Sequence, residues 1–199
     1  MKKLSLIIFA FFLIFKVSFA SSYNADPKIF ITELVNDAIN KLSDKNVGEE
    51  EKALFIEKIA LENVDINALG LYTLGDLRKN SNKEDLKKYQ DSFEKYFLKS
   101  LTSRLTDYSS NKFEVVSAEK KSSNYTIVKS KIVESENQPE IKIDWRIYTK
   151  NTEKPLIRDL IVEGLSLART QKEEFASILN SNDNDIKILI LKLNEFTNN

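Results

Sequence analysis

The stretch that most limits how this chain can fold is residues 141–179, IKIDWRIYTKNTEKPLIRDLIVEGLSLARTQKEEFASIL. Its first part alternates between apolar and polar residues, which is the period of a strand with one buried face. The apolar row is Ile141, Ile143, Trp145 and Ile147, and the polar row is Lys142, Asp144, Arg146 and Tyr148. The pattern therefore predicts a strand with one face in the core and the other in water.

A second strand and a helix follow. Pro155 has no N–H to donate and cannot continue a central strand, and a new apolar run extends over residues 156–167. The two runs predict an antiparallel hairpin. Gly164 interrupts the second run, and helical spacing begins at Gln171 with Phe175 and Leu179 on one side.

Helical patterns fill the part of the chain before these strands. Apolar residues recur at helical spacing over residues 26–42, 48–63, 65–75 and 81–108, and strand patterns follow over residues 113–135. A final helical pattern begins at Asn184 or Asp185. Helices followed by sequential strands predict an α+β fold, with helices packed on one face of a curved, roughly four-stranded antiparallel sheet.

The first twenty residues have the features of a secretory signal peptide. Lys2 and Lys3 precede an apolar run over residues 4–15, and Ser18 and Ala20 are the small residues at positions −3 and −1 of a cut after Ala20. The run would span about 18 Å as a helix, against roughly 30 Å of hydrocarbon, so an uncleaved anchor is the less favoured alternative. We expect cleavage after residue 20, a soluble exported protein and one domain over residues 21–199.

The absence of histidine and cysteine from the chain excludes several kinds of chemistry. An imidazole base, a thiol nucleophile, a His/Cys metal site and a disulfide are all ruled out. We therefore expect no enzyme activity, no catalytic residue, no cofactor and no metal site. The alternative is a small exported α+β enzyme that uses a buried carboxylate, but Asp144 and Asp159 alternate with core positions and should face away from them.

The charge balance argues against a nucleic-acid partner. The chain has 30 Lys and Arg against 30 Asp and Glu, and the predicted leader takes away Lys2, Lys3 and Lys16, which leaves a net charge of −3. A nucleic-acid-binding domain would carry a basic patch or stripe. We expect no nucleic-acid binding.

The order of these segments resembles the MlaC family, the periplasmic phospholipid-carrier component of an ABC-type lipid transport system, also known as toluene-tolerance proteins. The resemblance rests on IDWR at residues 143–146, the hairpin, RDLIVEGLSL at residues 158–167 and EFASIL at residues 174–179. It extends over residues 26–196, although Gly70 stands where Ala or another small helix former is expected, and Arg78 and Pro155 stand where many relatives carry Trp.

The resemblance implies a function in lipid transport. A member of this family would be a periplasmic monomer that shuttles phospholipid between outer- and inner-membrane complexes and so maintains outer-membrane lipid asymmetry. Its partners would be an inner-membrane ABC transporter with its lipid-binding ring protein and an outer-membrane lipoprotein–porin complex. An adaptor that binds only proteins is a further alternative.

A lipid carrier must enclose acyl chains, because each exposed CH₂ group costs about 0.8 kcal/mol. The resemblance implies an apolar cavity between the sheet and the long helix, with an ordinary filled core as the alternative. The expected lipid-binding residues are Phe93, Tyr96, Phe97 and Leu101 on the helix and Ile143, Trp145, Ile147, Val162 and Leu165 on the sheet. Arg169 and Lys172, near the strand-to-helix turn, are candidates for the head group.

Overall fold

The structure is a computed structural model that describes residues 23–105, 112–134 and 139–198. The predicted signal peptide and the end of the predicted helix at Tyr108 lie outside the described residues. The helices are α1 (Pro27–Ser43), α2 (Glu49–Asn63), α3 (Ile66–Thr73), α4 (Leu77–Asn80), α5 (Lys83–Leu105), α6 (Leu167–Asn180) and α7 (Ile186–Asn198). The strands are β1 (Phe113–Lys120), β2 (Tyr125–Ile132), β3 (Ile141–Tyr148), β4 (Leu156–Val162) and β5 (Leu165–Ser166).

Short polar side chains fix where the helices begin. The carboxylate of Asp26 accepts hydrogen bonds from the backbone N–H groups of Lys28 and Ile29 at the start of α1, and Asp65 accepts one from Ala68 at the start of α3. Ser81 and Glu84 have the spacing of a capping box, but at α5 the cap is Asn82, whose side-chain oxygen accepts a hydrogen bond from Asp85 N. The cap is therefore one residue later than a Ser-x-x-Glu box predicts.

The predicted α+β class and antiparallel sheet are confirmed. The strands pair in sequence order, β1-β2-β3-β4-β5, and all pairs are antiparallel. The sheet has five strands rather than four because a tight turn at Glu163 and Gly164 divides the second apolar run. Both residues have positive φ, 49° and 81°, as a two-residue hairpin turn requires, and the Glu163 carboxylate accepts a hydrogen bond from Lys142 N.

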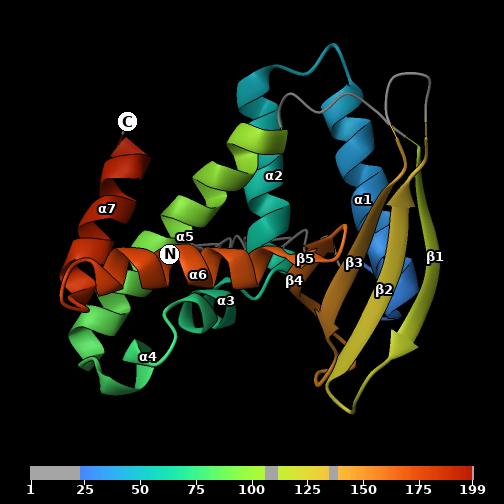
Figure 1. Cartoon of the computed structure of the whole chain (residues 1–199). Coiled ribbons are helices and arrows are strands. Elements are labelled where there is room, and N and C mark those ends of the chain that lie inside the picture. The colour runs from blue at the N-terminus through green and yellow to red at the C-terminus, as the bar shows by residue number, and fades with distance from the viewer. Residues whose placement is uncertain (1–22, 106–111, 135–138, 199) are drawn as a thin grey trace, which may run out of the picture.

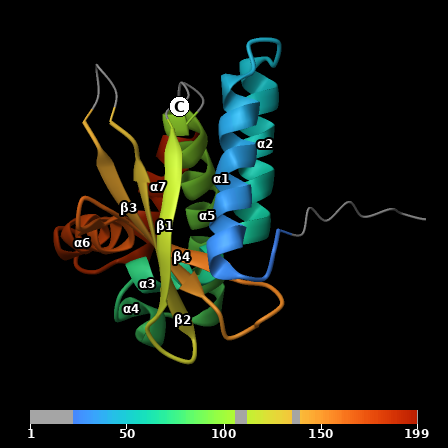
Figure 2. The same cartoon turned by 90° about the vertical axis from the view of Figure 1, so that its right-hand side faces the viewer.

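α1 runs along β1 and β2, whereas α6 packs against β4 and β5 at the other end of the sheet (Figures 1 and 2). We call the face toward α1 the inner face. The long helix α5 packs against α2, α3 and α7 instead of lying directly on the strands. The helices that contact the strands are α1 at β1 and β2, and α3 and α6 at β4 and β5.

The described part of the chain has three apolar clusters. The sheet cluster joins α1 to the inner face through Phe30, Ile31, Leu34, Val128, Ile147 and Ile157. The three-helix cluster, between α1, α2 and α5, is formed by Leu42, Ile56 and Ile59 with partly buried Ala38, Phe55, Leu101 and Leu105. The helical cluster is formed by Ile66, Leu74, Tyr89, Phe93, Phe175, Leu179, Ile186, Leu189 and Leu193.

The outer edge of β4 connects the sheet to the helical layer. β5 pairs with the last residues of β4, and Val64 forms a parallel bridge with Ile157, whose carbonyl accepts a hydrogen bond from Asp65 N at 2.9 Å. Both ends of this edge are therefore covered, which prevents it from pairing with another chain.

Candidate functional site

The inner face of β3 changes character along its length. Ile147 is fully buried beneath α1, whereas Trp145, Ile143 and Ile141 are only half-buried. Val162 of β4, which pairs with Ile143 of β3, is half-buried as well. The predicted phase of the strand is thus correct. One end of the apolar row belongs to the packed core, and the other end is a half-buried apolar face formed by Ile141, Ile143, Trp145 and Val162.

Trp145 is held in place by hydrogen bonds within the sheet. Its indole Nε1 donates to Ser130 Oγ at 2.8 Å, and Ser130 Oγ donates to the carbonyl oxygen of Ile143 at 2.9 Å. The ring of Phe113 meets the indole edge to face, with 6.3 Å between the centroids. The polar end of the indole is therefore satisfied, and its apolar surface is directed to the sheet cluster.

The aromatic residues of α5 do not face the sheet, and this corrects the prediction for Phe93, Tyr96 and Phe97. Phe93 is 2% exposed and lies in the helical cluster, edge to face with Phe175 of α6. Tyr96 donates a hydrogen bond to Gln171 Oε1 at 3.0 Å and lies 5.0 Å from the ring of Phe196. Helical spacing identifies a buried stripe but not the surface that covers it, and here α3, α6 and α7 cover it.

The same stripe contains a buried hydroxyl. Tyr89 lies in the helical cluster with its hydroxyl 2.9 Å from Thr73 Oγ1, and it donates to the carbonyl oxygen of Gly70 at 3.1 Å. Burial raises the pKa of the Tyr89 hydroxyl, so the group stays protonated and acts as a structural hydrogen-bonding group.

Leu101 is the one predicted helix residue that lies outside the helical cluster. It is partly buried in the three-helix cluster beside Leu105, Ile56 and Leu42. This cluster and the sheet cluster meet on α1, where Val35 contacts the sheet cluster and Ala38 the three-helix cluster. Partly buried apolar side chains from α1, α5 and β3 therefore belong to two adjoining clusters.

The remaining predicted residues do not join this region. Leu165 follows the turn at the end of β4 and is 69% exposed. Arg169 is exposed on α6 and pairs with Glu173, with 2.9 Å between Nε and Oε1. The ammonium nitrogen of Lys172 lies 5.3 Å from the centroid of the Tyr72 ring. The proposed head-group pair is thus engaged with neighbouring helical residues.

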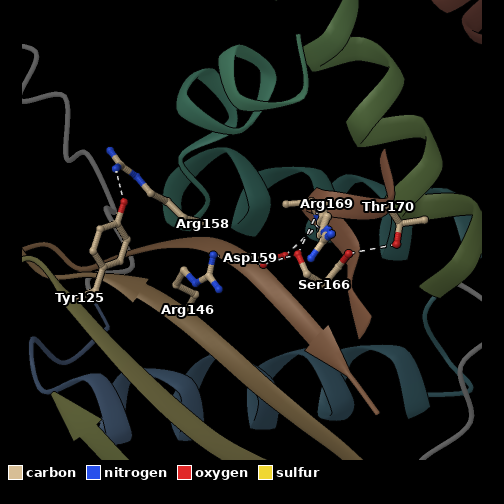
Figure 3. Close-up of polar contacts among 8 residues, drawn as sticks. Tyr125, Arg146, Arg158, Asp159, Ser166, Arg169 and Thr170 are labelled. Atoms are coloured by element: carbon tan, nitrogen blue, oxygen red, sulfur yellow. Dashed lines mark hydrogen bonds and ion pairs between the residues drawn. The ribbon is translucent and has the colours of Figure 1, made fainter. Parts of the chain in front are cut away.

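Asp159 is one of the two carboxylates, with Asp144, on which the enzyme alternative could rest. It faces away from Ile157, as expected, but the first turn of α6 buries it. Ser166 Oγ and Ala168 N donate to its two oxygens at 2.6 and 3.0 Å, and Arg146 Nη1 lies 3.6 Å away (Figure 3). A carboxylate with these partners orders the β4–α6 connection and is not presented to a substrate.

Arg158 is an important residue that the strand pattern did not identify. It is the extra residue of a β-bulge, since Arg146 pairs with Asp159 and Ile147 with Ile157. Its guanidinium donates to Asp65 Oδ2 and to the Tyr125 hydroxyl, the latter seen in Figure 3. A bulge has no sequence period, so a strand pattern alone cannot reveal it.

One hollow in the described part of the chain lies between α1 and α2, and four of its five lining residues are polar or charged, unlike those of the expected apolar cavity. It has a volume of about 330 Å³ and is lined by Asp37, Asn40, Lys41, Asp44 and Phe55. Within the described residues, no group of three or more metal-ligating side chains could hold an ion. No helix in the described part of the chain is both long and apolar enough to cross a bilayer.

Comparison with known proteins identifies a family and a shared fold. The sequence model of the family described as MlaC protein matches residues 32–195. A search of curated proteins gives no match. Among solved structures, the chain is similar to a phospholipid-binding protein from Ralstonia solanacearum in complex with a phospholipid, with a TM-score of 0.70 and 15% identity. The match covers 87% of this chain and 97% of that chain, so nearly the whole fold is shared.

Proposed function

The chain belongs to the MlaC family, and from this premise we propose that it is a periplasmic phospholipid carrier. The match of the family's sequence model to residues 32–195 is the observation that carries the proposal. The half-buried apolar face supports it, because a carrier needs apolar surface that the protein's own core does not fill. The predicted signal peptide over residues 1–20, and a single lipid-binding domain over residues 21–199, are part of the same proposal.

We place the acyl chains beside the half-buried part of the inner face. Ile143, Trp145 and Val162 would contact them from the sheet, and Leu101 from α5. Burying about ten methylene groups of one acyl chain is worth roughly 8 kcal/mol, enough to keep a lipid from leaving into water. The space must widen when lipid enters, and the partly buried residues where the two clusters meet are the ones that could separate.

The proposed carrier exchanges lipid with two membrane complexes. Its partners would be an inner-membrane ABC transporter with its lipid-binding ring protein and an outer-membrane lipoprotein–porin complex, and its role would be to maintain outer-membrane lipid asymmetry. The protein would hold its ligand without changing it, which fits the fully engaged Asp159.

We predict that protein purified from a bacterial host contains about one diacyl phospholipid per chain, measured by extraction and mass spectrometry. Lipid-free protein should take up labelled phospholipid from vesicles. Protein that contains no lipid and takes none up would favour the adaptor alternative. Lysophospholipid or fatty acid that accumulates with time would indicate an enzyme.

Trp145 gives a direct test of the lipid position because it is the only tryptophan of the chain. We predict that phospholipid with brominated acyl chains dims its fluorescence, since bromine quenches at near contact. The same lipid without bromine is the control for effects of loading alone. Equal emission with the two lipids would return Trp145 to the ordinary core and remove it from the proposed site.

A further inference from the structure

Lys52 is a buried lysine in the first turn of α2. The residue is only 9% exposed, although lysine is rarely buried and its long side chain usually keeps the ammonium in water. It precedes Ile56 by four residues and Ile59 by seven, so it shares the buried face of α2 with them. Lys52 is therefore on the face of α2 that packs into the three-helix cluster.

The ammonium of Lys52 is poorly satisfied where it lies. Within the described residues its partner is Glu49 Oε1 at 3.5 Å, and the Glu49 side chain is itself 68% exposed. A strong charge-assisted hydrogen bond spans about 2.7–2.9 Å, and an ammonium has three donors. The first turn of a helix also disfavours a positive charge. A second anion would relieve a buried cation of this kind.

The surroundings indicate which anion would fit. Ile56 and Ile59 form the three-helix cluster together with Leu42, and Leu101 and Leu105 of α5 pack against it. In Figure 1 the beginning of α2 lies near the end of α5, so the cation and the last apolar residues of α5 are at the same end of the bundle. A nearly buried cation at the end of an apolar wall matches a molecule with a phosphate and apolar tails.

We propose that Lys52 binds the phosphate of the bound phospholipid while an acyl chain lies along Leu101. This inference rests on the proposed function and adds the residue that recognises the head group, in place of Arg169 and Lys172. A lysine ammonium binds phosphate as a point charge, and the low dielectric of a nearly buried position strengthens that attraction. Free inorganic phosphate could bind an ammonium in the same way, so the experiment must distinguish a lipid phosphate from a free phosphate ion.

The test compares Lys52→Met with Lys58→Met, which removes an exposed lysine from the same helix. Lipid-free protein is mixed with vesicles that carry labelled phosphatidylethanolamine or labelled diacylglycerol with the same acyl chains. We expect Lys52→Met to lower phosphatidylethanolamine uptake about tenfold or more, as the loss of a hydrogen bond to a charged group does, and to leave diacylglycerol uptake unchanged. Lys58→Met should leave both unchanged.

A stability measurement separates head-group binding from a structural role. Without lipid, Lys52→Met should melt at the same temperature as the wild type or higher, because a poorly satisfied buried charge is removed. With phosphatidylethanolamine bound, the wild type should gain more in melting temperature than Lys52→Met.

Other outcomes overturn the inference. If Lys52→Met loses uptake of both lipids equally, Lys52 supports the fold. If it takes up both lipids as the wild type does, Lys52 does not contact the phosphate. Calorimetric titration with inorganic phosphate that detects binding to the wild type but not to Lys52→Met, with equal lipid uptake, would assign the site to a free anion. A wild type that takes up neither lipid would overturn the proposed function and this inference together.

Discussion

Replacing Arg158 with alanine is expected to lower the free energy of unfolding by about 2–4 kcal/mol. Arg158 Nε and Nη2 donate to Asp65 Oδ2 at 2.8 and 2.6 Å, and Nη1 donates to the Tyr125 hydroxyl at 2.8 Å. The guanidinium also lies over the ring of Tyr148, 3.5 Å from its centroid. One side chain therefore joins β4 to β2, to β3 and to the start of α3.

The expected effect is large because the variant leaves Asp65 without its cation. The Asp65 side chain is only 19% exposed, so its carboxylate would keep most of the cost of burial and lose the compensating charge. Asp65 also accepts the hydrogen bond from Ala68 N that begins α3. A disturbed Asp65 should thus weaken the helix start as well as the contact with the sheet.

Urea unfolding followed by circular dichroism measures this effect, and Arg169→Ala is the matched control. Arg169 forms an exposed pair with Glu173 one turn along α6, and its loss should change stability by less than about 0.5 kcal/mol. Removing Asp65 and Arg158 together should cost less than the sum of the single variants, since neither charge is then left alone. If Arg158→Ala loses no more stability than Arg169→Ala, the contacts of Arg158 with Asp65, Tyr125 and Tyr148 do not hold the sheet to the helices.

The two strands of the predicted hairpin show what the sequence could and could not predict. The phase of β3 was predictable, because an error of one residue would expose Ile147 and Trp145 and bury Arg146. In β4 the bulge at Arg158 changes which residues share a face after Ile157. That change places Asp159 beneath α6, and an alternation pattern could not have predicted its burial.

The candidate site was less predictable than the fold, because helical spacing names a buried face without naming its partner. The resemblance placed Phe93 and Tyr96 against the sheet, but both pack against Phe175 of α6. Leu101, Trp145 and Val162 were among the residues expected from the sequence, and they stay part of the proposed site. It gave no signal for Lys52, because a lysine at a buried helical position has the same sequence pattern as a lysine on the surface.

Gly70 is the position where a general rule for helices and the structure predict opposite results. Replacing a glycine in a helix with alanine usually stabilises it by about 0.5–1 kcal/mol. Gly70 lies within α3, but a Cβ atom there would be 2.8 Å from Phe93 Cδ1 and 3.2 Å from Cγ. We therefore expect Gly70→Ala to destabilise the protein by about 1–3 kcal/mol.

The size of this effect depends on whether the Phe93 ring can move. The rings of Tyr89, Phe97 and Phe175 surround it at centroid distances of 5.9, 6.2 and 6.2 Å. The backbone of α3 is also held, because the Gly70 carbonyl accepts a hydrogen bond from the Tyr89 hydroxyl. Neither the ring nor the helix can shift without disturbing the helical cluster.

The Phe93→Leu background tests this explanation directly. Leucine has no ring atoms above Gly70 and can rotate its side chain away, so the added methyl group no longer meets a rigid neighbour. In that background the cost of Gly70→Ala should fall to near zero or become a gain of about 0.5–1 kcal/mol, as in an ordinary helix. Thermal and urea unfolding are measured for the wild type, Gly70→Ala, Phe93→Leu and the double variant. The cost of Gly70→Ala is then compared between the wild-type and Phe93→Leu backgrounds. Equal costs in both backgrounds would mean that contact with Phe93 is not the reason for glycine at this position.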